Sequence, residues 1–246
     1  MKVMKTSLIA LIFLALTVLP ARAGWVVTTQ EDVSYYGNGI LKQVPSSQEG
    51  GPETIMNFAK GTVTMLDHNS RTYTTFKFEE FCELLKKIYA GAGPDMMALV
   101  KQMNESKPKP NVSIKRIGKG ETIAGFATTK YQVMNNGQPD RTVWMAEDSR
   151  FKKYNRSFFD RTMDGIKKMT RCDDIGMSGD TVDTSPAYFK LMKSGWLMKE
   201  EVVDEDEMGG SSPPVVKLVE KNLPASTFSV PKGYKKVPMA QFNMGY

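Results

Sequence analysis

The chain has 246 residues, of which 41% are hydrophobic and 24% are charged, so it is long enough to bury a substantial core. Its net charge is +6, but the first 23 residues carry three basic and no acidic residues, and the remainder carries only +3. The basic residues of that remainder alternate with acids. This argues against a nucleic-acid-binding protein, because such proteins gather Lys and Arg on one face.

The N-terminal segment has the features of a secretory signal peptide in the usual order. Two lysines precede an apolar run over residues 8–19, and an Ala-x-Ala pattern ends at Ala23. This order predicts cleavage between Ala23 and Gly24 and export to the periplasm, with secretion as the alternative destination. An uncleaved anchor is the alternative to cleavage, but the run is shorter than the roughly 20 residues that span a bilayer. We expect no transmembrane segment in the mature chain, residues 24–246.

Segments rich in Val, Thr and Tyr, separated by turn residues, predict a meander of antiparallel strands at the start of the mature chain. The first strand is expected over residues 25–36, before the turn at 37–39, which reads Gly-Asn-Gly. Further strands are expected over residues 40–44, 54–59, 62–66 and 71–76.

Apolar residues at helical spacing then predict helices over residues 78–89 and 95–103. Acidic residues early in the first helix and lysines later in it match the helix dipole. A second long amphipathic helix is expected over residues 151–169, and a short helical turn near Pro186. The strands expected between the two helical regions are 112–117, 126–134 and 141–146.

Turn residues mark the connections in the second half of the chain. Residues 118–120 (Gly-Lys-Gly) are expected to turn the chain, and residues 135–137 (Asn-Asn-Gly) to form a tight hairpin. The C-terminal part predicts a strand, an acidic loop, a return strand and an extended element, over residues 195–203, 204–214, 215–220 and 223–234. The succession of strands and helices predicts an α+β fold with a curved antiparallel sheet and helices on one face.

The chain has two cysteines, Cys82 and Cys172. In an oxidising compartment such a pair can form one disulfide, which would close a long loop. The alternative is two buried free thiols, which are common in protein cores. We favour the disulfide because the N-terminal segment predicts export.

One histidine, His68, falls between Asp67 and Asn69 in a predicted turn. A catalytic histidine has to be held by packed neighbours beside a nucleophile, and a turn provides no such packing. One histidine and two distant cysteines also match no zinc-ligand spacing. We therefore interpret His68 as a solvated residue.

Acidic residues at positions 200–207 and 17 methionines are the other candidates for holding a metal ion. The acidic run lacks the ordered ligand spacing of a calcium-binding loop, so a solvated hairpin tip is the preferred interpretation. The methionines are spread along the chain rather than grouped with histidines as copper(I) carriers need, so they are interpreted as core residues or as the lining of an apolar groove. The chain has no phosphate-binding or nucleophile motif. We expect no cofactor, no metal site and no enzymatic activity.

Three segments together resemble a known family. Residues 121–126 (ETIAGF), 130–133 (KYQV) and 143–146 (VWMA) look like the core of an uncharacterised family of exported bacterial proteins, and residues 223–234 are similar to its closing pattern. That family resembles the lipoprotein-carrier fold of periplasmic lipoprotein-sorting proteins. The resemblance implies a single domain over residues 24–246, in which a strongly curved antiparallel sheet forms an incomplete barrel. Helices would cover its concave face and enclose a hydrophobic cavity.

The resemblance brings no catalytic residues, but it suggests a ligand. The first hypothesis is an exported protein that binds a lipid acyl chain or a lipoprotein in the cavity between sheet and helices, with Tyr131, Trp144 and Trp196 as lining candidates on predicted strands. The second is a non-enzymatic envelope protein that has a filled core and works through a protein partner. The third, a hydrolase or metal-dependent enzyme, has no motif to support it.

Overall fold

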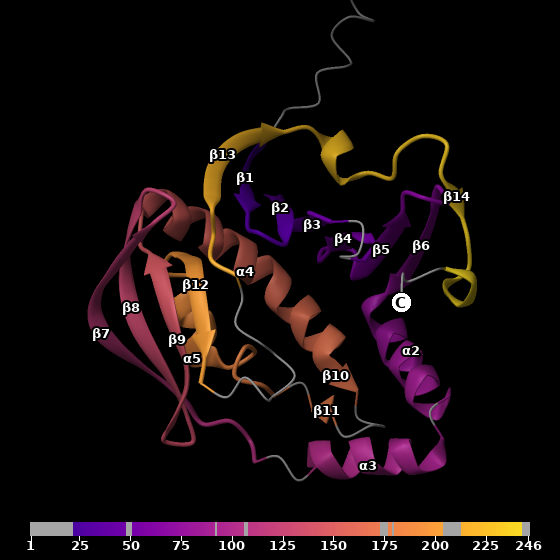
Figure 1. The fold of residues 1–246 in the computed structure, drawn as a ribbon, viewed down its shortest axis with the longest axis horizontal. Coiled ribbons are helices and arrows are strands. Elements are labelled where there is room, and N and C mark those ends of the chain that lie inside the picture. Colours follow the sequence, from indigo (N-terminus) through magenta and orange to yellow (C-terminus); the bar gives the residue numbers. More distant parts are fainter. Residues whose placement is uncertain are drawn as a thin grey trace, which may run out of the picture.

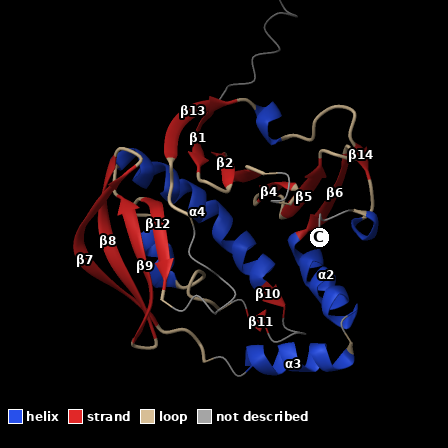
Figure 2. Cartoon of the chain, viewed as in Figure 1, coloured by secondary structure: helices blue, strands red, loops and turns tan. Residues whose placement is uncertain are grey.

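The computed structural model describes residues 22–47, 51–91, 93–105, 108–172, 177–178, 180–203 and 213–242. Its architecture is α+β, as the sequence predicts, and strands predominate over helices (Figures 1 and 2). Most of the acidic loop expected over 204–214, and all but the last two residues of the predicted signal peptide, lie outside the described residues. None of the helices described is long and apolar enough to cross a membrane.

The larger sheet contains eight strands in the order β13-β1-β2-β3-β4-β5-β6-β14. Its neighbouring strands are antiparallel except for β14, which runs parallel to β6. The strand bounds are β1 Arg22–Thr28, β2 Asp32–Gly37, β3 Ile40–Pro45, β4 Glu53–Asn57, β5 Thr62–Asp67, β6 Thr72–Lys77, β13 Lys217–Leu223 and β14 Lys235–Lys236.

The single strand expected over residues 25–36 is in fact a hairpin, so that prediction was wrong. The turn between β1 and β2 has no Gly or Asn and is built by the side chain of Thr29. Its Oγ1 accepts hydrogen bonds from the backbone N–H groups of Glu31 and Asp32, both at 3.1 Å, and donates to Asp32 Oδ1 at 2.7 Å. A Thr hydroxyl can supply these local hydrogen bonds in place of the usual turn residues.

The smaller sheet has four strands in the order β12-β9-β8-β7. The bounds are β7 Val112–Ile123, β8 Phe126–Asn135, β9 Gln138–Ala146 and β12 Trp196–Val202. The β8–β9 hairpin turns at Asn136 and Gly137 as predicted, with φ values of 52° and 83°. The turn expected at residues 118–120 was wrong: β7 continues through this segment with register shifts, and the chain turns at Ala124 and Gly125, with φ values of 49° and 83°.

Four helices lie within the described residues: α2 Phe78–Gly91, α3 Pro94–Glu105, α4 Ser149–Thr170 and α5 Pro186–Met192. Short elements complete the chain: β10 Arg171–Cys172, β11 Met177–Ser178, η3 Ala225–Phe228 and η4 Met239–Gln241. A disulfide joins Cys82 of α2 to Cys172 of β10, with a Cα–Cα distance of 5.4 Å. The extended element expected over 223–234 is replaced by the end of β13, the 3₁₀ turn η3 and irregular chain.

Helix α4 lies between the two sheets, and the cores meet along it (Figure 1). On the eight-stranded side, Phe158 of α4 packs with Phe58 and with Phe78 of α2. At its N-terminal end, Phe151 packs with Trp25 of β1 and Trp196 of β12. Burial of these rings removes a large apolar area from water, which is the main favourable term holding helix and sheets together.

The opposite face of the four-stranded sheet packs against α5. Val133, Val143 and Met145 are fully buried there beneath Tyr188 and Leu191. The α+β class is therefore confirmed, but the described strands form two main sheets where the sequence predicts one.

The segment before β13 connects the two sheets. The Val215 N–H donates to the Met198 carbonyl of β12, and the Val216 N–H donates to the Thr28 carbonyl of β1, both at 2.8 Å. One stretch of backbone thus bonds first to β12 of the smaller sheet and then to β1 of the larger sheet.

Candidate ligand cavity between the two sheets

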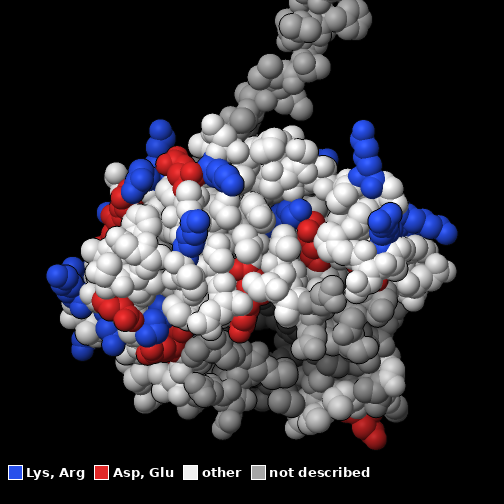
Figure 3. All heavy atoms as spheres, turned by 45° about the horizontal axis from the view of Figure 1, so that its top comes forward, with Lys and Arg blue, Asp and Glu red and all other residues white. Residues whose placement is uncertain are grey.

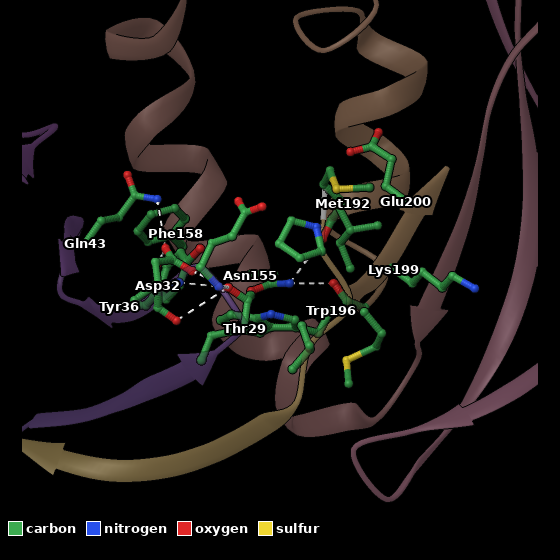
Figure 4. A pocket seen from close by; sticks show the side chains of 18 of the residues that line it. Thr29, Asp32, Tyr36, Gln43, Asn155, Phe158, Met192, Trp196, Lys199 and Glu200 are labelled. Atoms are coloured by element: carbon green, nitrogen blue, oxygen red, sulfur yellow. Dashed lines mark hydrogen bonds between the residues drawn. The ribbon is translucent and has the colours of Figure 1, made fainter. Parts of the chain in front are cut away.

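A cavity of about 400 Å³ lies where β1, β2 and β3 face α4 and the edge strand β12 (Figure 4). This volume falls within the range of roughly 300–1,000 Å³ that is usual for small-molecule sites. The lining residues come from three parts of the chain: Val27, Thr29, Glu31, Asp32, Ser34, Tyr36 and Gln43; Asn155, Phe158 and Phe159; and Met192, Gly195 to Glu200, Pro213 and Val215.

One part of the lining is aromatic. The ring of Tyr36 meets those of Phe158 and Trp196 edge to face, with centroids 5.7 Å and 5.1 Å apart. The three side chains come from β2, α4 and β12, so the cavity depends on how both sheets pack against one helix. Met198 and Val27 extend this apolar surface. Such a surface favours the apolar part of a ligand over water.

Asn155 fixes the position of β12 relative to α4. Its buried side-chain amide donates to the carbonyl of Met192 at 3.2 Å and to that of Gly195. These carbonyls lie at the end of α5 and just before β12, a region that would otherwise leave buried backbone acceptors unsatisfied. A side chain at Gly195 would collide with the backbone of Ala146 and Glu147, so only glycine allows this close approach. Trp196 is held in the lining by this arrangement.

The opposite part of the lining is polar and centres on Asp32. Its carboxylate accepts hydrogen bonds from Thr29 Oγ1 at 2.7 Å, Ser34 Oγ at 2.8 Å and Gln43 Nε2 at 3.3 Å (Figure 4). All three donors are uncharged. The carboxylate is therefore oriented by neutral groups at the wall of the cavity.

The negative charge of Asp32 acts on the aromatic part of the lining. Burial raises the pKa of Tyr36 to about 12, and the nearby charge of Asp32 adds to the shift, while a hydrogen bond with Ser34 opposes it. Tyr36 is therefore a neutral phenol at physiological pH.

At the other end of the cavity, Glu200 belongs to a buried ionic cluster. It accepts hydrogen bonds from Arg141 Nη1 at 2.9 Å and from the Tyr188 hydroxyl at 3.2 Å. Arg141 also pairs with Asp140 and Asp183. Burial raises the pKa of the Tyr188 phenol, and the charge of Glu200 raises it further. The cluster joins β9, β12 and the segment before α5, and its ion pairs and hydrogen bonds hold these elements together.

The cavity adjoins a second, polar groove of about 630 Å³. The residues that line both are Glu31, Asp32 and Gln43. The other described residues that line the groove are Gln30, Pro45, Ser46, Ser47, Pro52 and Thr54, none of which is aromatic. Asp32 therefore stands on the boundary between an apolar cavity and a polar groove.

Of the three residues predicted to line a ligand site, Trp196 lies in the cavity wall, whereas Tyr131 and Trp144 are not part of that lining. Trp144 is buried, with the ammonium groups of Lys130 and Lys199 at 4.7 Å and 4.6 Å from its ring centroid. Tyr131 lies in the middle of β8, and its hydroxyl donates to Oε1 of Glu147, the residue after β9, at 2.6 Å. The site residues that sequence reasoning missed are Asp32 and Asn155. The sequence carries no local signal for either of them.

His68 lies in the turn between β5 and β6, as expected, but it is more than a solvated residue. Its Nε2 is 3.1 Å from the carboxylate of the buried Glu53, and Nδ1 contacts the Tyr234 hydroxyl. Lys42 Nζ pairs with the same carboxylate at 2.8 Å. The group connects the C-terminal segment to the sheet and lies outside both the cavity and the groove. Across the described ranges, no three His, Cys, Asp or Glu side chains are grouped so as to hold a metal ion.

On the face drawn in Figure 3, the charged side chains of the described residues are dispersed. Figure 3 shows Lys and Arg side chains at several separate places on this face, interspersed with Asp and Glu. The described residues of this face thus form no single basic stripe of the kind that tracks a nucleic-acid backbone.

Comparison with known proteins adds little to this geometry. No model of a known protein family matches the chain, and no curated protein matches it. Among solved structures, an uncharacterised conserved protein from Thermus thermophilus is similar over 88% of this chain and 90% of its own, with 10% sequence identity and a TM-score of 0.42.

Proposed function

We propose that this chain is an exported, non-enzymatic binding protein that holds the apolar part of a ligand, such as a lipid acyl chain, in the cavity between the two sheets. The observation that carries the proposal is the cavity itself: about 400 Å³, with an aromatic wall made by Tyr36, Phe158 and Trp196. A lipoprotein is included among the ligands, since its acyl chains offer the same chemistry.

The connection between the sheets supports a carrier-like architecture. Because Val215 and Val216 bond to β12 and β1, the four-stranded and eight-stranded sheets follow each other around α4. We propose that they act as one incomplete barrel whose concave side is covered by α4 and α5. In that arrangement the cavity corresponds to the space between sheet and helices that the resemblance implies.

The start of β1 is compatible with the proposed export. Arg22 and Ala23 pair with Leu223 and Asn222 at the end of β13. Cleavage after Ala23 would remove these two pairs and keep the pairs from Gly24 to Thr28. The mature chain would thus retain most of β1. We propose that it is located in the periplasm.

A pair of valine substitutions tests the proposed site. Val215 is buried and lines the cavity, whereas Val219 lies on β13 outside it and is 37% exposed. We expect Val215→Phe to occupy part of the cavity and to reduce uptake of a fluorescent, uncharged fatty alcohol, and Val219→Phe to leave uptake unchanged.

Native mass spectrometry of the wild-type protein from the periplasm provides an independent readout, with an acyl-chain adduct expected. Absence of both adduct and uptake would overturn the proposal. Circular dichroism of both variants establishes that they are folded.

A surface on α3 favours a second candidate function, binding of an envelope protein. Met96 and Leu99 on this helix are 40% and 50% exposed. Exposed apolar side chains on one helix are common at protein interfaces. Crosslinking in cells through a photoreactive residue at position 99 would capture a partner under this alternative, and a matched residue at Lys115 on β7 would not.

A further inference from the structure

The acidic residue at the boundary of cavity and groove narrows the class of ligand. We propose that the ligand is a single-chain amphiphile with a cationic head group, whose ammonium lies against the Asp32 carboxylate while its apolar chain occupies the cavity. This inference rests on the proposed function, because it assumes that the cavity takes an apolar chain.

The first argument is that, among the described residues, Asp32 has no cationic partner. Its contacts in the described part of the chain are hydrogen bonds from Thr29, Ser34 and Gln43, and the ion pairs there do not include it. A carboxylate forms a stronger hydrogen bond with a charged donor than with a neutral one. A cationic head group would supply that donor.

The second argument is the sign of charge around the site. In the polar groove the charged lining residues are Glu31 and Asp32, both acidic. In the cavity the basic lining residue is Lys199, whose Nζ pairs with Glu121 at 3.1 Å and Glu201 at 2.8 Å. Figure 4 shows the Lys199 side chain directed away from Asp32. Among the lining residues that the structure describes, an anionic head group would face carboxylates without an available counter-charge, and this disfavours fatty acids and phospholipid phosphates.

The third argument is the position of Asp32 along the path of a bound chain. It lies where the aromatic wall ends and the polar groove begins, so an amphiphile in the cavity would place its head group beside this carboxylate. The effect of Asp32 on the Tyr36 phenol shows that its charge reaches the adjoining apolar wall. A cation at the boundary therefore gains attraction without leaving the solvated groove.

Three amphiphiles with the same alkyl chain separate the contribution of the chain from that of the head-group charge. They are dodecyltrimethylammonium, dodecyl maltoside and dodecanoate, each titrated calorimetrically below its critical micelle concentration. We expect the cationic compound to bind most tightly and dodecanoate most weakly. Raising the salt concentration should weaken binding of the cationic compound and leave the maltoside unchanged.

Asp32→Asn keeps the side-chain shape and removes the charge. We expect binding of dodecyltrimethylammonium to weaken roughly tenfold, the loss of one charge-assisted contact, with the maltoside affected less than about twofold. Because Asp32 also closes the β1–β2 turn, a second variant keeps that residue: Gln43→Lys places a cation beside the carboxylate and should weaken cationic binding similarly. Asp164→Asn, an exposed change on α4 outside the lining, is the matched control and should have no effect.

The outcomes distinguish this inference from the function on which it rests. Equal binding of all three compounds, or unchanged cationic binding in Asp32→Asn and Gln43→Lys, would overturn the cationic head group and leave the apolar cavity standing. Binding of none of the three would overturn both.

Discussion

The two faces of the β9–β12 region are packed in different ways. Toward α5, Val133, Val143 and Met145 are fully buried and the core is closed. Toward β1, β2 and α4, large rings such as Tyr36 and Trp196 meet edge to face and leave a cavity of about 400 Å³. The closed core forms between one sheet and the helix covering it. The cavity forms where elements of two sheets converge.

This difference is explained by the side chains and by the geometry of the packing elements. Aliphatic side chains of two facing elements interdigitate and fill the space between them. The rings of Tyr36, Phe158 and Trp196 project from β2, α4 and β12 and meet at their edges, and a cavity remains beside them. We infer that the closed core provides stability and that binding is confined to the junction.

Removing the disulfide should lower the unfolding free energy more than any other change. The loss should be confined to the eight-stranded side of the molecule. Cys82 and Cys172 are 90 residues apart in sequence, and their bond ties α2, which covers the eight-stranded sheet, to the end of α4. We expect the Cys82→Ser, Cys172→Ser double variant to lose about 4 kcal/mol of unfolding free energy, measured in urea.

Amide hydrogen exchange measures which elements are destabilised when the disulfide is removed. Amides in α2 and in the C-terminal part of α4 should lose protection against exchange. Amides in β8 and β9 should exchange only when the whole protein unfolds, as in the wild type. Equal loss in both regions would contradict the idea that the two sides are stabilised separately.

Two methionines on neighbouring strands form a matched test of closed core against cavity. Met145 of β9 and Met198 of β12 are 0% and 1% exposed, but Met198 lines the cavity. We expect Met145→Ala to lower the free energy of unfolding by about 3 kcal/mol, because it creates a new void. Met198→Ala should cost about 2 kcal/mol, since it enlarges a space that already exists.

The same pair should differ in binding. Met198→Ala is expected to shift the preferred alkyl chain toward greater length in a calorimetric series, and Met145→Ala to leave the preference unchanged. A change of chain preference in Met145→Ala would show that the two regions are not separate.

The smallest expected effect concerns the start of α4, the helix shared by both regions. Asp148 caps this helix, and its carboxylate accepts hydrogen bonds from the side chain and the backbone N–H of Arg150, which together lower its pKa to about 2. A lowered pKa means that the stabilisation is present above the unfolded value of about 3.9 and is lost as the pH falls through about 2.

We therefore expect Asp148→Ala to be less stable than the wild type at pH 7 and the difference to close between about pH 4 and pH 2. Thermal unfolding followed at these pH values measures it. Asp164→Ala, an exposed acid on the same helix, is the control and should show no such trend. A difference that persists at pH 2 would mean that the carboxylate is not what stabilises the helix start.

The sequence predicted local elements better than their assembly. Helix α4 and the hairpin at Asn136 and Gly137 follow from apolar spacing and turn chemistry, and both lie close to where they were expected. The β1–β2 turn was missed because its geometry comes from the Thr29 hydroxyl rather than from Gly or Asn. The residues that line the cavity could not be predicted from the sequence, because Asp32 and Asn155 acquire their roles only when β2, α4 and β12 meet.

The pairing of β1 with β13 determines when the larger sheet can finish folding. Val26 in β1 pairs with Val219 in β13, near the opposite end of the chain. As the polypeptide emerges from its N-terminus, β1 to β6 can form their hairpins, but the outer edge of β1 stays unpaired until residues 217–223 appear. For that interval the nascent sheet presents an open hydrogen-bonding edge, the kind of surface that recruits chaperones or other strands.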